Sequence, residues 1–233
     1  MLGWGRTPVS GSGALKLKPE LKLENVSISA GGRKILSGLS LELLKGFRLL
    51  IKGASGSGKS TFLKCLLGFV PFEGRITVKG VPLTPQTSGQ CRLFFSYVPQ
   101  GLDVFSGLLK EELEEVFRAK ANRNKALGFG CFLEHLRVLG FENADFSLLE
   151  KRWESFSGGE KQRILIAVAL TLERDILLFD EPTSALDEEL KGRIVDHMRR
   201  LEKSLVVVSH DEVWERLDNL KVLELAEGGW RIR

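Results

Sequence analysis

The sequence is poor in cysteine. It has only 3 cysteines in 233 residues, Cys65, Cys91 and Cys131, and they are far apart without any metal-ligand spacing. An odd set of distant cysteines excludes a disulfide framework and is typical of free thiols in a reducing compartment. Cys65 lies in an apolar stretch at residues 62–67, which predicts a small buried core residue.

A long apolar run is also lacking. The longest one, residues 164–172, is bounded by Arg163 and Glu173, and it is far shorter than the about 20 residues that a membrane-spanning helix needs. Residues 1–18 are rich in Gly and Ser and have no apolar segment, so they do not resemble a signal peptide and are expected to form a flexible tail. We therefore expect a soluble chain that reaches a membrane only through a partner.

The sequence has only a slight excess of positive charge. The net charge is +4, from 34 Lys and Arg against 30 Asp and Glu, and the basic residues are spread along the chain among acidic neighbours. Because a nucleic-acid groove needs a denser basic stripe, we expect no nucleic-acid partner. The hydrophobic content of 43% is enough for one α/β domain with a sizeable core.

The apolar pattern predicts an α/β fold with a mostly parallel sheet. Strands are expected at residues 21–28, 39–44, 47–51, 75–79, 93–98, 176–179 and 205–209, followed by terminal β structure, and helices at 59–67, 108–119, 130–139, beyond 160 and at 188–203. Aliphatic strands that alternate with helices indicate a parallel sheet buried on both faces. A mostly helical lobe is expected at about residues 101–157.

A glycine-rich segment carries the clearest chemistry. It fits the pattern G-x-x-x-x-G-K-[ST] and consists of Gly53, Ala54, Ser55, Gly56, Ser57, Gly58, Lys59, Ser60 and Thr61. Glycines let backbone N–H groups surround a β-phosphate, which the positive end of the next helix also attracts. Lys59 would contact the β- and γ-phosphates, and the Ser60 hydroxyl would bind Mg²⁺. A chance match is the alternative, but the preceding apolar strand and the following amphipathic helix favour a phosphate loop.

An apolar strand at residues 176–179 ends in two adjacent carboxylates, Asp180 and Glu181. At the carboxyl edge of a sheet, Asp180 is placed to hold the hydration shell of Mg²⁺. Glu181 could polarise an attacking water, which is the positioning role that phosphoryl transfer asks of a protein. A solvated turn is the alternative for this segment alone, and the upstream phosphate loop favours catalysis.

A second helix start has two interpretations. Ser157 and Glu160 have the spacing of a capping box, which is a stability device. Gly158 and Gly159 lie between them and would expose N–H groups at a positive helix end, which makes a second anion site. The chain would then have two phosphate-binding helix starts and one set of Mg²⁺ ligands.

From about Leu21 onward, the sequence resembles the ATP-binding cassette family of ATPases. GASGSGKST is similar to the Walker A motif, Gln100 in YVPQ to the Q-loop, and FSGGEKQR to the family signature, with Phe156 in place of the more usual Leu. ILLFDEP is similar to Walker B, residues 184–187 to the D-loop, and His210 in VVVSHD to the switch histidine. These six motifs occur in the family's order, which makes the match specific.

The resemblance implies a P-loop NTPase core with an N-terminal antiparallel β region and the inserted helical lobe, forming an ATPase domain at residues 19–233. ATP and Mg²⁺ would be its cofactors. Family members form a head-to-tail dimer, so each ATP would lie between the phosphate loop of one subunit and Ser157, Gly158 and Gly159 of the other.

The resemblance also implies roles for single residues. Gln100 would contact Mg²⁺ and sense the attached partner, and Glu181 would act as the general base or orient the water. His210 would hold the γ-phosphate and Glu181 in register, while Asp187 would communicate across the dimer. Many relatives have an adenine-stacking aromatic residue where this sequence has Ala30, so stacking worth roughly 1–3 kcal/mol per base is missing there or is supplied elsewhere. Strict preference for ATP over GTP is therefore not expected from this position.

The first functional hypothesis is the energy-coupling subunit of a transporter with separate transmembrane permease subunits. Such a homodimer would be cytoplasmic and peripheral on the inner membrane. Leu102, Val104, Phe105 and Leu108 offer an apolar surface for a permease helix, with lobe core as the alternative. The chain also resembles small bacterial subunits proposed to serve iron export, though only weakly. A soluble iron–sulfur cluster assembly ATPase is the second hypothesis, and cargo and direction are not encoded in these motifs.

Overall fold

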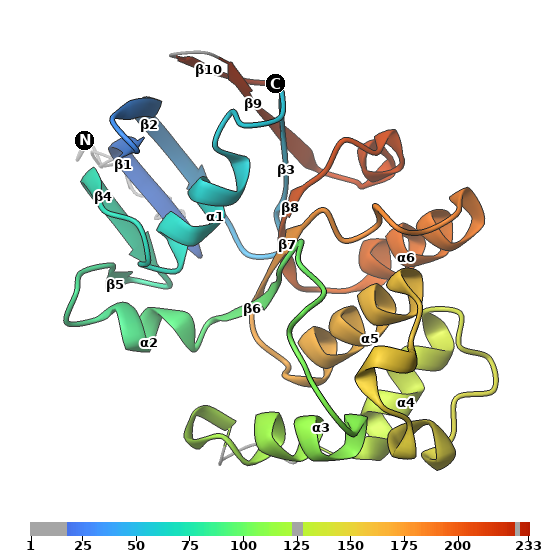
Figure 1. Ribbon diagram of the computed structural model, residues 1–233. Coiled ribbons are helices and arrows are strands. Elements are labelled where there is room, and N and C mark those ends of the chain that lie inside the picture. The colour runs from blue at the N-terminus through green and yellow to red at the C-terminus, as the bar shows by residue number, and fades with distance from the viewer. Residues whose placement is uncertain (1–17, 123–127, 227–228) are drawn as a thin grey trace, which may run out of the picture.

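The computed structural model describes residues 18–122, 128–226 and 229–233, so the expected tail falls outside the described residues except for Lys18. The described residues form two sheets and two groups of helices (Figure 1). The first sheet is antiparallel and has the order β2-β1-β4-β5, with β1 at Leu21–Ala30, β2 at Arg33–Leu43, β4 at Phe72–Val78 and β5 at Val81–Pro82.

The second sheet has six strands and is mostly parallel. Its order is β10-β9-β3-β8-β7-β6, with β3 at Arg48–Gly53, β6 at Phe95–Val98, β7 at Ile176–Asp180, β8 at Ser204–Val208, β9 at Leu220–Ala226 and β10 at Gly229–Ile232. Only β9 and β10 pair in antiparallel fashion within this sheet as described. Its strands are apolar on both faces because one face packs on α1 and the antiparallel sheet, and the other packs on the remaining long helices.

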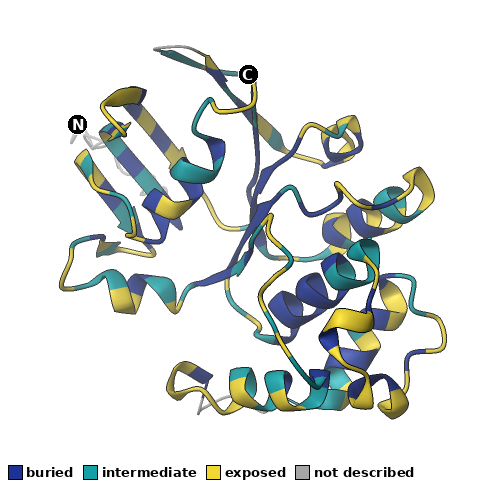
Figure 2. Ribbon diagram, viewed as in Figure 1, coloured by how far each residue is buried: buried dark blue, intermediate teal, exposed yellow. Residues whose placement is uncertain are grey.

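The helices complete the layers. They are α1 (Lys59–Leu66), α2 (Ser88–Arg92), α3 (Leu109–Arg118), α4 (Phe129–Val138), α5 (Gly158–Thr171) and α6 (Glu188–Arg200), with 3₁₀ turns η1 (Lys120–Asn122), η2 (Phe146–Glu150), η3 (Trp153–Ser155) and η4 (Glu212–Arg216). Buried residues concentrate in the six-stranded sheet and in α5, whereas α3 is more exposed (Figure 2). In the described part of the chain, no helix combines the length and apolarity that crossing a bilayer requires. The expected α/β fold with its antiparallel region and helical insert is confirmed.

The boundary of β2 differs from the expected strand at 39–44. Gly31 and Gly32 have φ of +59° and +74°, so they close a tight hairpin that begins pairing at once, with Ala30 opposite Arg33. The first residues of β2 are polar and exposed, because one face of an antiparallel sheet can face water. The apolar pattern therefore did not predict this part of the strand.

Three other segments differ from what the sequence predicted. The strand expected at 93–98 begins at Phe95, because the N–H groups of Leu93 and Phe94 donate to the carbonyls of Gln90 and Cys91 and extend the end of α2. Neither α2 nor the two-residue β5 was expected, because both are too short for a hydrophobic period to show.

The expected helix at 188–203 ends at Arg200, and a buried arginine accounts for its end. Arg48 is 6% exposed, and its guanidinium donates to the carbonyls of Met198 at 3.3 Å and Leu201 at 2.5 Å, and to that of Lys203. Burial lowers the pKa of this guanidinium. Arg48 thus caps the carbonyl end of α6 and ties it to the start of β3.

We expect Arg48→Met to lower the free energy of unfolding by about 1–3 kcal/mol, because it keeps the apolar stem but removes the side-chain donor to the partly buried carbonyls of Leu201 and Lys203. Urea denaturation of the purified protein measures the change. Arg199→Met is the matched control, since Arg199 is 51% exposed and pairs with Asp218 at the surface, and it should have a much smaller effect. Equal effects of the two variants would contradict the capping role.

Candidate functional site

The glycine-rich loop lies between β3 and the start of α1 at Lys59. Gly58 has a φ of +99°, and a Cβ added there would lie 2.2 Å from Cγ2 of Ile35. Only glycine therefore fits where the loop turns into the helix. Lys59 is 8% exposed, and its Nζ donates to the carbonyls of Gly53 at 2.8 Å and Ala54 at 3.1 Å. Its ammonium group consequently lies within the curve of the loop.

A cavity of about 620 Å³ opens in front of this loop. Its lining is drawn from segments far apart in the sequence: Ser55, Gly56, Gly58, Lys59, Ser60, Thr61, Gln100, Asp180, Glu181, Ser184, Val208, His210 and Asp211. The fold thus brings the phosphate loop, Gln100, both carboxylates of residues 180 and 181, and His210 to one place. Ser184, Val208 and Asp211 also line the cavity and were not among the expected site residues.

Asp180 ends β7, which lies between β8 and the edge strand β6 of the six-stranded sheet, and is 2% exposed. Its Oδ1 is buried without a hydrogen-bond partner, which is costly for a carboxylate unless a cation is provided. Burial raises the pKa of Asp180, and the Ser60 hydroxyl and the charge of Lys64 oppose that shift. Carboxylate and hydroxyl oxygens are ligands that Mg²⁺ accepts, so Asp180 and Ser60 fit this ion, with Gln100 on the same cavity wall.

Glu181 and His210 lie next to each other in the lining of the cavity. The distance between Glu181 Oε1 and His210 Nε2 is 3.6 Å, with side-chain exposures of 13% and 59%. Burial raises the pKa of Glu181, while His210 and Lys59 oppose the shift. The backbone of Glu181 has a φ of +50°, which non-glycine residues rarely adopt, and its N–H donates to the carbonyl of Val208 at 2.9 Å.

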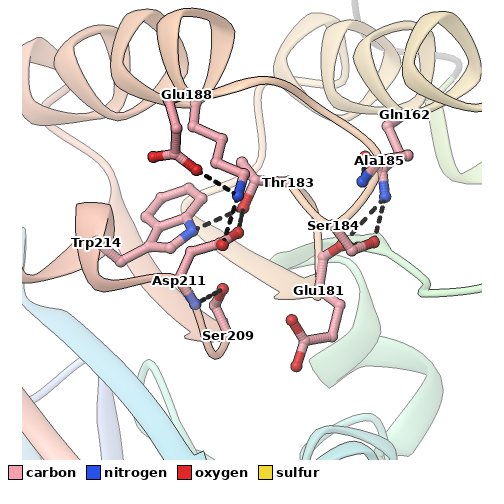
Figure 3. Close-up of polar contacts among 10 residues, drawn as sticks. Gln162, Glu181, Thr183, Ser184, Ala185, Glu188, Ser209, Asp211 and Trp214 are labelled. Atoms are coloured by element: carbon pink, nitrogen blue, oxygen red, sulfur yellow. Dashed lines mark hydrogen bonds and ion pairs between the residues drawn. The ribbon is translucent and has the colours of Figure 1, made fainter.

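A network around Asp211, the residue directly after His210, holds this part of the chain (Figure 3). The Thr183 hydroxyl donates to Asp211 Oδ2 at 2.6 Å, and the indole N–H of Trp214 donates to the Thr183 oxygen at 3.1 Å. Lys191 from α6 pairs with Asp211 Oδ1 at 2.7 Å. Sequence reasoning missed this network, although Asp211 directly follows His210 in VVVSHD and Thr183 directly follows DEP.

At the second helix start, the capping box is present in full. The Ser157 hydroxyl accepts from the Glu160 N–H at 3.3 Å, and Glu160 Oε2 accepts from the Ser157 N–H at 2.8 Å. Gly159 has an additional reason to be glycine, because a Cβ there would lie 2.9 Å from the carbonyl oxygen of Ala185. Close packing inside the chain thus requires this glycine.

Several expected site residues do not line the cavity. Ser157, Gly158 and Gly159 begin α5, and Asp187 caps α6, where its Oδ1 accepts from the Leu190 N–H at 2.9 Å. Ala30 ends β1 and packs partly against the core of the antiparallel sheet. The residues expected to face a partner's nucleotide thus lie apart from the chain's own phosphate loop.

A protein-family model for the ABC transporter family matches residues 36–184, which is most of the chain. That stretch includes the phosphate loop, Gln100, the start of α5 and both carboxylates at the end of β7. The chain belongs to the ABC transporter family. Binding and hydrolysis of ATP are characteristic of this family's cassettes, so the chain is an ABC-type ATPase.

Several relatives of this ABC cassette are known. The histidine/lysine/arginine/ornithine transport ATP-binding protein HisP of Salmonella typhimurium is 35% identical over 216 residues, covering 85% of this chain and 83% of HisP. The arginine transport ATP-binding protein ArtM of Bacillus subtilis is 36% identical, covering 82% and 81%. A lactococcin transport/processing protein, LcnC-like, of Lactococcus lactis is 33% identical, and there this chain spans only 27% of the relative's length.

Solved ABC cassettes have the same fold. The dimeric post-hydrolysis structure of the cassette MJ0796 with ADP and Pi has a TM-score of 0.77 at 26% identity, covering 91% of this chain and 97% of the cassette. A bacterial Atm1-family ABC exporter with ATP bound has a TM-score of 0.78 at 28% identity, covering 92% of this chain and 38% of the exporter. The shared architecture therefore occurs both as a separate cassette and within a longer chain.

We expect Asp180→Asn to remove the effect of Mg²⁺ on nucleotide binding, because the amide supplies no negative charge at the buried Oδ1 position. The affinity for ATP with excess Mg²⁺ should fall to the value measured in EDTA, and the EDTA value should stay unchanged. Isothermal titration calorimetry measures both. Asp175→Asn, at an exposed aspartate paired with Lys79, is the control. Binding that Mg²⁺ still tightens as in the wild type would exclude Asp180 as a ligand.

Proposed function

We propose that this ABC ATPase is the energy-coupling subunit of a transporter with separate membrane-spanning chains, and that it works as a head-to-tail homodimer. The observation that carries this proposal is the separation of Ser157, Gly158 and Gly159 from the chain's own ATP cavity. The positive start of a helix binds anions. In a dimer, the phosphates of the ATP bound to the second copy would be that anion. Relatives named as transport ATP-binding proteins and a cassette solved as a dimer support the same arrangement.

In this proposal, Ser60, Asp180 and Gln100 hold Mg²⁺ beside the phosphates. When bound, the ion neutralises charge that develops on the phosphate oxygens. The loop from Gly53 to Thr61 donates its backbone N–H groups, and the ammonium group of Lys59 turns from the loop carbonyls to the phosphates. The D-loop residue Asp187 faces the partner subunit.

Hydrolysis in this proposal depends on Glu181 and His210. The carboxylate of Glu181 orients the attacking water and accepts its proton, a task for which a pKa raised by burial is suited. His210, with Nε2 at 3.6 Å from Glu181, holds the carboxylate and the γ-phosphate in register. The Asp211 network keeps His210 in place from behind.

We expect Glu181→Gln to abolish steady-state ATP hydrolysis, because the amide cannot accept the proton of the water, and general-base contributions are typically about 10²–10⁴-fold. The variant should also accumulate as an ATP-bound dimer. Phosphate release and size-exclusion chromatography measure the two effects, with Glu189→Gln on the exposed side of α6 as the control. Wild-type turnover in Glu181→Gln would remove Glu181 from the catalytic role.

We infer that the membrane chain docks outside the apolar segment that was expected to receive it after Gln100. Leu102 and Phe105 pack against the core of the helical lobe. The ring centroids of Phe105 and Trp153 are 5.1 Å apart. Both residues thus fit the alternative that this segment belongs to the core of the lobe. Val104 is 44% exposed.

An apolar pocket of about 480 Å³ lies elsewhere, between the end of α1 and β5, and Phe69 in its wall is 64% exposed. We infer that this pocket receives an apolar segment of the membrane chain.

We expect Phe69→Glu to reduce capture of the integral membrane chain at least about tenfold, because burying a carboxylate in an apolar contact is costly. ATP hydrolysis by the isolated protein should be unchanged. Pull-down from detergent-solubilised membranes measures capture, with Val138→Glu as a control at another exposed apolar residue, 42% exposed on α4. Equal capture by Phe69→Glu would exclude this pocket. Capture of a soluble scaffold alone by the wild type would favour iron–sulfur assembly instead.

A further inference from the structure

Gln162 is a buried amide that contacts the backbone of Glu181. It does not line the cavity, and the sequence predicted no role for it. It lies on α5, in the turn that follows Gly159, and is 3% exposed. Its Nε2 donates to the Ser184 hydroxyl at 2.8 Å and to the carbonyl of Glu181 at 3.2 Å. Its Oε1 accepts from the N–H of Ala185 at 3.0 Å. All three bonds reach one short turn, residues 181–185 (Figure 3).

These bonds hold the backbone of Glu181 in its unusual conformation. Its φ of +50° is rare for a residue with a side chain and persists only where the surroundings fix it. The Glu181 N–H is bound by the carbonyl of Val208, and its carbonyl accepts from Gln162 Nε2 and from the Ser184 hydroxyl at 3.1 Å. The side chain of Glu181 points away from Gln162 (Figure 3), so Gln162 acts on the backbone and not on the carboxylate.

The same turn packs closely on the start of α5. A Cβ at Gly159 would lie 2.9 Å from the carbonyl oxygen of Ala185 and 3.0 Å from Cδ2 of Leu186. Gln162 and Gly159 therefore join residues 181–185 to α5 at two adjacent places. Glu181 thereby has a fixed position relative to the helix whose first residues are Ser157 and Gly158.

We propose that Gln162 is a positioning residue for ATP hydrolysis, which holds the backbone of Glu181 and ties it to α5. This inference rests on the proposed role of Glu181 as the water-orienting base. Because a displacement of about 1 Å of a reacting group can cost about 10²-fold in rate, loss of this anchor lowers turnover while leaving the phosphate loop and the Mg²⁺ ligands intact.

The test compares Gln162→Glu with the matched control Gln90→Glu at an exposed glutamine on α2. Gln162→Glu keeps the acceptor for the Ala185 N–H but places an oxygen against the Glu181 carbonyl, so that a donor is replaced by a repulsive contact. We expect kcat for Mg-ATP hydrolysis to fall roughly 10²-fold, with KM and the Kd for ATP within about threefold of the wild type. Wild-type kcat, or a loss confined to KM, would overturn the proposal.

Two further variants separate positioning from folding and from the dimer. Ser184→Ala, at an exposed serine, removes the hydroxyl donor to the Glu181 carbonyl without disturbing the core and leaves the Ser184 N–H, at 3.4 Å, as a weaker donor, so it should lower kcat several-fold. Gln162→Glu combined with Glu181→Gln should still form the ATP-bound dimer. Wild-type kcat in Ser184→Ala, or loss of that dimer in the double variant, would contradict the positioning role. Absence of the dimer in Glu181→Gln alone would instead contradict the proposed function.

Discussion

The site depends on how the carboxyl end of β7 is held. There, a buried carboxylate at Asp180, whose Oδ1 has no hydrogen-bond partner, is followed by Glu181 with a left-handed backbone. Neither arrangement is favourable by itself, since one leaves a buried carboxylate oxygen without a hydrogen bond and the other strains the chain. Both persist because β7 lies between β6 and β8 and because α5 anchors the next turn through Gln162. The surrounding packing therefore places two adjacent carboxylates in different environments, which suits one to a cation and the other to a water.

The phosphate loop depends on the same kind of long-range support. Ile35 belongs to the antiparallel sheet, yet its side chain lies where a Cβ at Gly58 would have to be. The small N-terminal sheet thus helps to shape the start of α1, in addition to enclosing its own core. Arg48 serves the opposite end of the same strand, β3, by capping α6. The strand β3 is therefore in contact with α6 at its first residue, Arg48, and leads into the phosphate loop at its last residue, Gly53.

Gly58 and Gly159 have to be glycine for two different physical reasons. In the phosphate loop, the backbone adopts left-handed angles beside a neighbouring side chain. At the start of α5, Gly159 has an ordinary backbone, and the approach of the Ala185 carbonyl excludes a side chain. The second reason links α5 to Glu181 within one chain. In the proposed dimer, the helix start that serves one ATP and the glutamate that serves the other would therefore belong to one packed unit.

The sequence by itself determined the features that depend on neighbouring residues. The phosphate loop, the Ser157–Glu160 capping box and the apolar strand before Asp180 are local patterns, and the order of the motifs indicated the family. Contacts between distant segments were decided only by the tertiary structure. Ile35 against Gly58, Arg48 at the end of α6, Gln162 under Glu181 and Asp211 behind His210 were not predicted, because each depends on which strands become neighbours and on how closely their backbones approach. The apolar residues after Gln100 show the same limit, since hydrophobicity alone could not separate partly buried Phe105, which packs against the core, from exposed Val104.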